Sequence, residues 1–214
     1  MPSISLLPFT TLLLYAGTAL FAASGAMAAA KRRHDIVTFV FFAAIAGLGG
    51  GTLRDLLLGQ PITWVRDPSY MLTAVVVGAL VWIVGFREQA AKLLLWPDAL
   101  GLSAFTVLGA HKALTLHYGA SVAVLMGVLT ATAGGIIRDI TAGEPSVLLG
   151  REIYITAALL GAIVYAIAAP LVGSGLASLA GFLAGAALRI AAMILGWRLP
   201  SYRGGLMGAR EGAG

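Results

Sequence analysis

The sequence predicts an all-α membrane protein with seven transmembrane helices, built as two inverted three-helix repeats plus a seventh helix. The first observation behind this prediction is composition. Of the 214 residues, 59% are hydrophobic and 11% are charged, with a mean hydropathy of +0.94, whereas a soluble domain carries about a quarter charged residues. The second observation is a motif, Gly-Gly-x-x-Arg-Asp, which starts at Gly50 and again at Gly134, 84 residues later.

The composition also excludes several function classes. The chain has no cysteine and three histidines, so thiolate and histidine-rich metal sites are not expected. Because the sequence has no nucleophile–base pattern, phosphate loop or metal-ligand spacing, we expect neither an enzyme nor a cofactor, and no metal beyond transient monovalent cations. The net charge of +5 comes from basic residues between apolar runs and near the C-terminus. This indicates membrane topology and anionic lipid rather than a nucleic-acid partner.

Apolar runs define the expected helices, because a bilayer core about 30 Å thick needs about 20 apolar residues per span. The seven runs lie near 6–30, 36–58, 69–85, 93–113, 119–142, 152–172 and 174–197. The third run is the shortest. Only a break around Gly173 separates the last two, so six spans are the alternative.

Basic residues favour seven spans and predict the orientation. No positive charge precedes the first run and a basic cluster follows it, which is the reverse of a secretion signal. With seven spans one side of the membrane receives Lys31, Arg32, Arg33, Arg87, Lys92, Arg151, Arg198, Arg203 and Arg210. The other side receives Arg66 and, at the end of a span, Lys112. The positive-inside rule therefore predicts a multi-pass protein of the inner (plasma) membrane with the N-terminus outside and the C-terminus in the cytoplasm.

An internal repeat covers the first six runs. At the 84-residue offset, Gly17, Phe21, Gly25, Arg54, Asp55, Gly59, Pro61 and Tyr70 fall on Gly101, Phe105, Gly109, Arg138, Asp139, Gly143, Pro145 and Tyr154. We interpret this as a duplication. Each copy holds three spans, an odd number, so the second copy must be inverted, with a permeation or binding site near the midplane. The expected parts are a first repeat (1–88), a second repeat (89–172), a seventh helix (173–197) and a cytoplasmic tail (198–214).

The glycines of the motif stand inside apolar helices. They are Gly49, Gly50 and Gly51 in the first copy and Gly134 and Gly135 in the second, where an alanine replaces the leading glycine. Each interior glycine costs roughly 1 kcal/mol of helix propensity relative to alanine. The cluster therefore predicts a kink or break that frees carbonyls for a cation. Close helix packing through small residues is the alternative.

Arg54, Asp55, Arg138 and Asp139 are candidate pore-proximal charges, because a charge within a span is costly unless it is paired or hydrated. Consecutive residues on a helix do not face each other. Inverted repeats would instead allow Arg54 to pair with Asp139 and Arg138 with Asp55. Separate charged vestibules, or simple snorkelling to the interface, are the alternatives.

Three further charges lie at or within the apolar runs. Lys112 has no charged counterpart in the first repeat, where the equivalent residue is Ala28. It is a candidate gate, with snorkelling as the alternative. Asp98, near the start of the fourth run, is interpreted as a helix-start carboxylate. Arg189 lies mid-way along the last run and requires a subunit interface, a carboxylate partner or the pore.

Two motifs of the form G-G-x-x-R-D-x-x-x-G-x-P in a seven-run chain resemble the prokaryotic members of the trimeric intracellular cation (TRIC) channel family, from about residue 10 to 197. The resemblance implies a homotrimer with a pore in each subunit, permeable to potassium with limited discrimination against sodium. It also implies kinks in the second and fifth helices at the motif glycines, and a pore-proximal role for both Arg-Asp pairs. The lysine motif that animal members use for phosphoinositides has no counterpart near Arg54 or Arg138.

We therefore expect a passive, potassium-permeable channel for monovalent cations, embedded in a lipid bilayer. A secondary transporter of a small solute such as glycine is the alternative, because inverted repeats with broken helices also suit alternating access. A membrane scaffold without transport fits poorly with buried Arg-Asp pairs.

Overall fold

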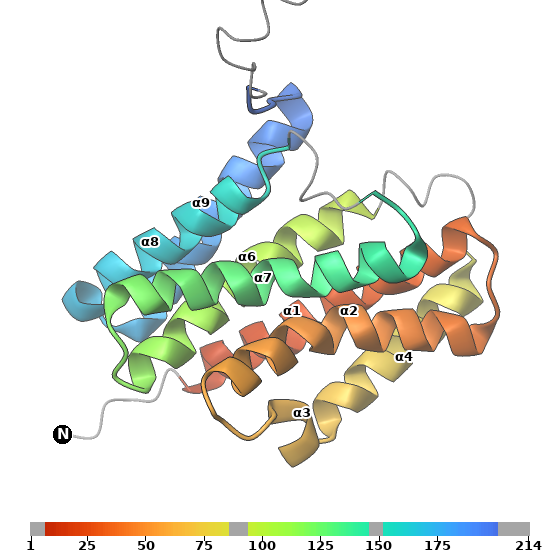
Figure 1. Cartoon of the computed structure of the whole chain (residues 1–214), viewed down its shortest axis with the longest axis horizontal. Helices are drawn as coiled ribbons and strands as arrows, with labels where there is room; N and C mark the ends of the chain where they lie inside the picture. The colour runs from red at the N-terminus through yellow and green to blue at the C-terminus, as the bar shows by residue number, and fades with distance from the viewer. Residues whose placement is uncertain (1–6, 86–93, 146–151, 201–214) are drawn as a thin grey trace, which may run out of the picture.

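A computed structural model describes residues 7–85, 94–145 and 152–200, and this part of the chain is helical (Figure 1). The helices are α1 (Leu7–Lys31), α2 (Ile36–Leu57), α3 (Thr63–Arg66), α4 (Ser69–Val84), α6 (Leu95–Thr115), α7 (Ala120–Ala142), α8 (Ile155–Val172) and α9 (Ser174–Leu195). Within the same ranges the only extended pairing is one antiparallel bridge between Glu152 and Arg198. Each apolar run lies on one long helix, and only the four-residue α3 was not expected.

Five helices are long and apolar enough to cross a membrane, namely α1, α2, α7, α8 and α9. Helix α4 has 16 residues, and α6 carries Asp98 and Lys112 within its 21 residues. The prediction of an all-helical membrane protein is confirmed, while the seven-span count and the inversion stay predictions. Five residues of the basic pattern, Arg87, Lys92, Arg151, Arg203 and Arg210, lie outside the described residues.

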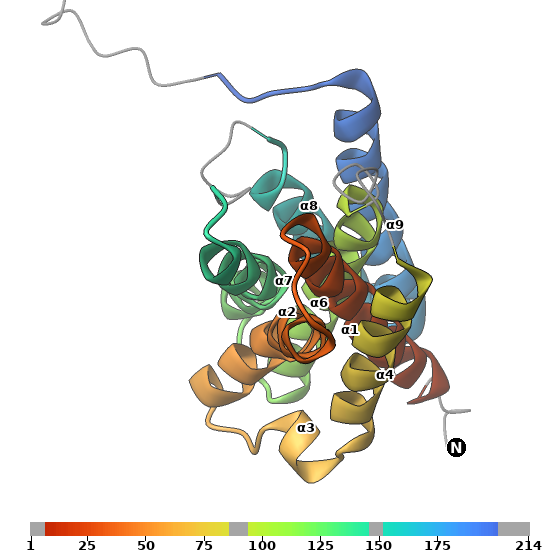
Figure 2. The same ribbon diagram turned by 90° about the vertical axis from the view of Figure 1, so that its right-hand side faces the viewer.

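Helices α1 and α6 form the centre of the molecule, between α2 and α7 on one side and α4 and α9 on the other (Figure 2). They meet through residues that the repeat makes equivalent. Phe21 of α1 stacks on Phe105 of α6 with ring centroids 5.3 Å apart. Gly17 faces the Phe105 ring and Gly101 faces the Phe21 ring. The absence of side chains on the two glycines leaves the space that these rings fill.

Helices α2 and α7 lie side by side through the motif glycines (Figure 1). A Cβ atom at Gly134 would lie 2.5 Å from the carbonyl oxygen of Ala46, and one at Gly50 would collide with that of Thr130. Ala46 and Thr130 are themselves 84 residues apart, so the two contacts are reciprocal. Small residues here let the two backbones approach closely.

We expected a kink or break at the motif, and the structure shows no break. Helices α2 and α7 each continue without interruption through their glycines. The physical reason is that a backbone carbonyl without a hydrogen-bond partner in apolar surroundings costs several kcal/mol of free energy. Close packing, the alternative, is what the glycines provide, and a bend of either helix axis stays a prediction.

The outside of the bundle is apolar. Large hydrophobic side chains are exposed along the outer faces of α4, α8 and α9, among them Leu72, Leu80, Ile83, Ile167, Leu171, Leu176, Leu183 and Ile194. Exposed apolar surface on this scale is expected for helices that face lipid or a partner subunit.

Candidate functional site

Arg54 and Asp55 lie buried in the last turns of α2 and pair with each other. The Nε and Nη2 atoms of Arg54 each lie 2.8 Å from Oδ1 of Asp55. The arginine side chain is long enough to turn back on its neighbour, although consecutive Cβ atoms diverge on a helix. Among the described residues no ion pair joins Arg54 to Asp139 or Arg138 to Asp55, so the cross-repeat pairing is not observed.

Two further groups complete the coordination of Asp55. Its Oδ2 accepts hydrogen bonds from the backbone N–H of Thr63, at 2.8 Å, and from the Thr63 hydroxyl, at 2.7 Å. Lys112, from α6, donates to Oδ1 at 2.7 Å. We call Arg54, Asp55, Thr63 and Lys112 the Arg54 centre. It contains two cations and one carboxylate.

Arg138 and Asp139 form a second buried pair at the equivalent position of α7. The Nε and Nη2 atoms of Arg138 lie 2.9 and 2.8 Å from Oδ1 of Asp139. The remaining nitrogen, Nη1, donates to Oδ1 of Asp98 at 2.5 Å and to the Ser24 hydroxyl. We call Arg138, Asp139, Asp98 and Ser24 the Arg138 centre. It contains one cation and two carboxylates.

The interpretation of Asp98 as a helix-start carboxylate was incomplete. Asp98 does lie in the first turn of α6, but its side chain is buried and paired with Arg138. Sequence reasoning also missed Thr63 and Ser24, because neither residue belongs to a charged motif. One signal was available for Asp98, since its repeat equivalent is Leu14 and a carboxylate that replaces an apolar residue inside a span requires a partner.

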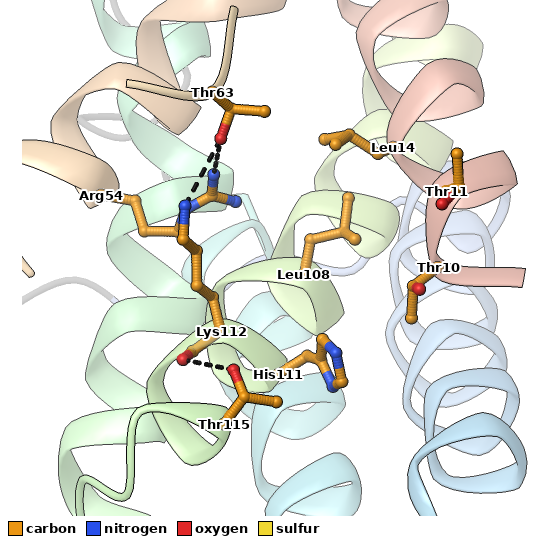
Figure 3. Close-up of a pocket in the computed structure, with 9 residues that line it drawn as sticks. All are labelled: Thr10, Thr11, Leu14, Arg54, Thr63, Leu108, His111, Lys112 and Thr115. Carbon is orange, nitrogen blue, oxygen red and sulfur yellow. Dashed lines mark hydrogen bonds between the residues drawn. The ribbon is translucent and has the colours of Figure 1, made fainter. Parts of the chain in front are cut away.

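A pocket of about 250 Å³ opens beside the Arg54 centre, between α1, α2 and α6 (Figure 3). Its lining residues are Thr10, Thr11, Leu14, Arg54, Thr63, Leu108, His111, Lys112 and Thr115. A smaller cavity of about 20 Å³ lies next to it and reaches Gly47, Gly51 and Phe105. Arg54 lines both spaces. The polar pocket therefore ends at a buried charged centre, next to the central aromatic pair.

Lys112, the candidate gate, lies between the pocket and Asp55. Its side chain is 26% exposed, while Arg54 is 3% exposed and Asp55 is fully buried. The neighbouring His111 is fixed by a 2.7 Å hydrogen bond between its Nδ1 and the hydroxyl of Tyr165 in α8. Lys112 is thus the most exposed of the three charged side chains, and its role as a gate stays a prediction.

The sequence left three environments open for Arg189 of α9: a subunit interface, a carboxylate partner or the pore. The structure shows a carboxylate partner. Its Nη2 lies 2.6 Å from Oε2 of Glu152, and its guanidinium lies 5.1 Å from the centre of the Tyr154 ring. Tyr154 in turn packs beneath Gly135, where an added Cβ would lie 2.7 Å from the tyrosine hydroxyl. Arg189 therefore ties α9 to the region of the Arg138 centre.

No group of three or more metal-ligating side chains lies close enough together to hold a metal ion in the part of the chain that the structure describes. The two centres are instead arginine–carboxylate clusters, whose charges neutralise one another in part. Such clusters can hold a helix end, bind an ion of either sign, or limit the passage of ions.

Comparison with known proteins gives consistent matches. A family profile described as "Glycine transporter" matches residues 11–85 and 95–170. The inner membrane protein YadS of Escherichia coli is 39% identical over 155 residues, covering 71% of this chain and 75% of that protein. The membrane protein YvgT of Bacillus subtilis is 34% identical, covering 69% and 75%.

Solved structures match over most of the chain. The TRIC trimeric intracellular cation channel orthologue from Rhodobacter sphaeroides is 43% identical, with a TM-score of 0.85, over 88% of this chain and 99% of that one. A second TRIC cation channel is 36% identical, with a TM-score of 0.80, over 90% and 97%. The Trimeric Intracellular Cation channel from Caenorhabditis elegans, at 15% identity and a TM-score of 0.58, shares the fold.

Proposed function

Because this chain belongs to the prokaryotic trimeric intracellular cation channel family, we propose that it is a passive, potassium-permeable channel for monovalent cations. The observation that carries the proposal is the polar pocket that ends on Arg54 and Lys112 inside an apolar bundle. Intramembrane charges of this kind mark ion pathways.

We propose seven spans in two inverted repeats, with the N-terminus outside. Reciprocal contacts support this, since Gly50 packs on Thr130 and Gly134 on Ala46. The side chain of Arg32 donates to the Gly143 carbonyl at 3.3 Å, which joins two loops that this topology puts on the cytoplasmic side. The proposed location is the inner (plasma) membrane, and one relative is named an inner membrane protein.

The proposed pathway enters through the pocket, passes the Arg54 centre and leaves past the Arg138 centre, between α2 and α7. Lys112 is its gate, because it is the cation of the Arg54 centre most open to the pocket. Motions of the motif glycines, Gly49, Gly50, Gly51, Gly134 and Gly135, bend the two helices and open the narrow part. No carboxylate is among the pocket-lining residues, so no site there holds one cation tightly. This supports limited discrimination between potassium and sodium.

Each subunit of the proposed homotrimer holds its own pathway. The names of the related solved structures include trimeric channels, and the exposed apolar faces of α8 and α9 offer surface for contacts with lipid or a neighbouring subunit. The proposed function needs no cofactor and no enzymatic step.

A secondary transporter of a small solute such as glycine is the second candidate, favoured by the description of the matching family profile. Bilayer recordings of the purified protein in a potassium gradient separate the two, because only an open channel passes enough ions per second to give resolvable unitary currents. Saturable glycine uptake into liposomes without unitary currents would favour the transporter.

The role of the two carboxylates of the motif is tested in the same recordings. Asp55→Asn and Asp139→Asn, made singly, are expected to change the unitary conductance or the open probability. Unchanged currents with a lower melting temperature would mean that the Arg-Asp pairs serve only to stabilise the helices.

A further inference from the structure

The two arginines of the motif differ in what binds their third nitrogen. At Arg138, Nε and Nη2 bind Asp139, and Nη1 binds the Asp98 carboxylate and the Ser24 hydroxyl. At Arg54, Nε and Nη2 bind Asp55 in the same way. Its Nη1 has no hydrogen-bond partner among the described residues and is accessible rather than fully buried, since Arg54 lines the pocket.

The 84-residue offset shows which residues stand at Arg54 in place of the two partners of Arg138. Asp98 and Ser24 are equivalent, at the 84-residue offset, to Leu14 and Leu108. Both leucines line the pocket beside Arg54. Figure 3 shows the free arm of the Arg54 guanidinium directed toward the side where these two leucines lie. The pocket therefore occupies the place where the other centre holds a carboxylate and a hydroxyl.

The lining of the pocket selects the sign of an occupant. Arg54 and Lys112 contribute two positive charges, and none of the nine lining residues is acidic. Asp55 lies behind them, fully buried, with both oxygens already bound. Thr10, Thr11 and Thr115 are also among the lining residues. With Lys112 in this position a cation would meet two like charges, as the proposed gate requires, whereas an anion would gain charge-assisted hydrogen bonds.

We propose that this pocket binds a small carboxylate anion, with one oxygen on Nη1 of Arg54 in the place that Asp98 takes on Arg138. Lys112, which also lines the pocket, supplies the second charge. The volume of about 250 Å³ holds an anion of a few carbon atoms. This binding is inferred from the geometry of the pocket. Its effect on ion flow rests on the proposed function: an anion bound here obstructs the pathway and holds Lys112 in place.

The test uses the full chain purified in detergent, with acetate as the probe and chloride at equal ionic strength as the reference. Isothermal titration calorimetry is expected to give saturable acetate binding at one site per chain. Glycine carries the same carboxylate beside an ammonium group, which would lie near Lys112, so it is expected to bind more weakly. Absence of saturable acetate binding would overturn the proposal. Tighter binding of phosphate than of acetate would overturn the carboxylate assignment, and tighter binding of glycine would overturn the preference for an anion over a zwitterion.

Leu14→Asp is the decisive variant, because it gives Arg54 an internal carboxylate like Asp98. It is expected to weaken acetate binding roughly tenfold or more, the effect of one lost charge-assisted contact. Leu14→Met, the apolar control, is expected to bind like the wild type. If Leu14→Asp fails to fold, Lys112→Met, which leaves Asp55 bound to Arg54 and Thr63, is expected to weaken binding by a similar factor. Wild-type affinity in a folded Leu14→Asp or in Lys112→Met would contradict the site.

Potassium currents separate this inference from the proposed function. Currents that acetate does not reduce, together with no acetate binding, would sink the inference and leave the channel standing. Saturable acetate binding without any unitary current would support the anion site and contradict the channel. Acetate that both binds and reduces the current in the wild type, but not in Leu14→Asp, supports both.

Discussion

The Arg54 and Arg138 centres begin from the same residues and differ in what α6 adds to each. In both, an arginine binds the aspartate that follows it through Nε and Nη2. Helix α6 then contributes Lys112 to the first centre and Asp98 to the second, whereas α1 has Ala28 and Leu14 at the equivalent positions.

One helix has therefore changed the charge of both centres. The Arg54 centre holds an excess of positive charge and faces a pocket, and the Arg138 centre is buried with two carboxylates around one arginine. Asp98 stands in the first turn of α6 and Lys112 in its last, the ends at which the helix dipole favours each sign. The two centres share the residues of the 84-residue offset, and they differ because α6 carries charges where α1 has Leu14 and Ala28.

The largest effect is expected from Asp98→Ala, which leaves Nη1 of the buried Arg138 without its carboxylate. Removing one partner of a buried ion pair costs about 3–5 kcal/mol. The measurement is the free energy of unfolding in detergent by chemical denaturation. Leu14→Ala, at the equivalent position of the other centre, removes only apolar contacts of a half-buried side chain and is expected to cost less. Equal losses of unfolding free energy in the two variants would contradict the difference in charge pairing between the two centres.

The next effect concerns what the two repeats share. Gly50→Ala and Gly134→Ala each place a methyl group against a backbone carbonyl of the neighbouring helix, and overpacking of this kind costs about 1–3 kcal/mol. Gly51→Ala is the matched control, because its nearest neighbour is Nη2 of Arg54 at 3.8 Å. Its melting temperature should be unchanged or higher, since alanine favours the helix. Similar losses at Gly50 and Gly134 support reciprocal packing, and a loss at only one of them contradicts it.

Lys112→Met tests the excess positive charge at the pocket. Two unit charges 4 Å apart in water interact by about 1 kcal/mol, so the unitary potassium conductance should rise up to roughly fivefold at low salt. The gain should shrink as ionic strength rises. Single-channel recording at two salt concentrations is the measurement, and Lys31→Gln, at the end of α1, is the control. A conductance that falls or stays constant would remove Lys112 from the pathway.

The smallest effect concerns the starts of α2 and α7. Asp35 caps α2 by accepting from the Thr38 N–H at 2.8 Å, whereas the equivalent cap of α7, Gly119, has no side chain to do so. Hydrogen bonds from the backbone and hydroxyl of Thr38 hold the pKa of Asp35 below its usual range. Asp35→Gly should lower the melting temperature slightly, and Gly119→Asp should raise it slightly.

The pH dependence of the Asp35 effect has a definite sign. Because the folded-state pKa is lowered, the cap stabilises the protein above the usual carboxylate pKa and is lost as the pH falls through the lowered value. The difference between wild type and Asp35→Gly should thus be full at neutral pH and vanish in acid. A difference that persists in acid would mean that Asp35 acts other than as a charged cap.

Helix positions followed from the sequence because apolar run length and bilayer thickness are local properties. Each run lies on one helix, and Gly50 and Gly134 were identified as special positions. Their action was left open, since glycines in a row favour both a helix break and a close approach of neighbouring helices. Only the neighbouring helix, with its carbonyls at Ala46 and Thr130, decided between them.

The charged centres show most clearly what the sequence determined and what only the tertiary structure decided. The sequence by itself determined that Arg54, Asp55, Arg138 and Asp139 must be paired or hydrated, because a lone charge in an apolar span is too costly. It also determined that Lys112 breaks the repeat. Which partners satisfy these charges depends on side-chain reach across helices, and only the tertiary structure decided that Lys112 binds Asp55 and Asp98 binds Arg138. The space left at Arg54, where Leu14 replaces a carboxylate, is a product of both.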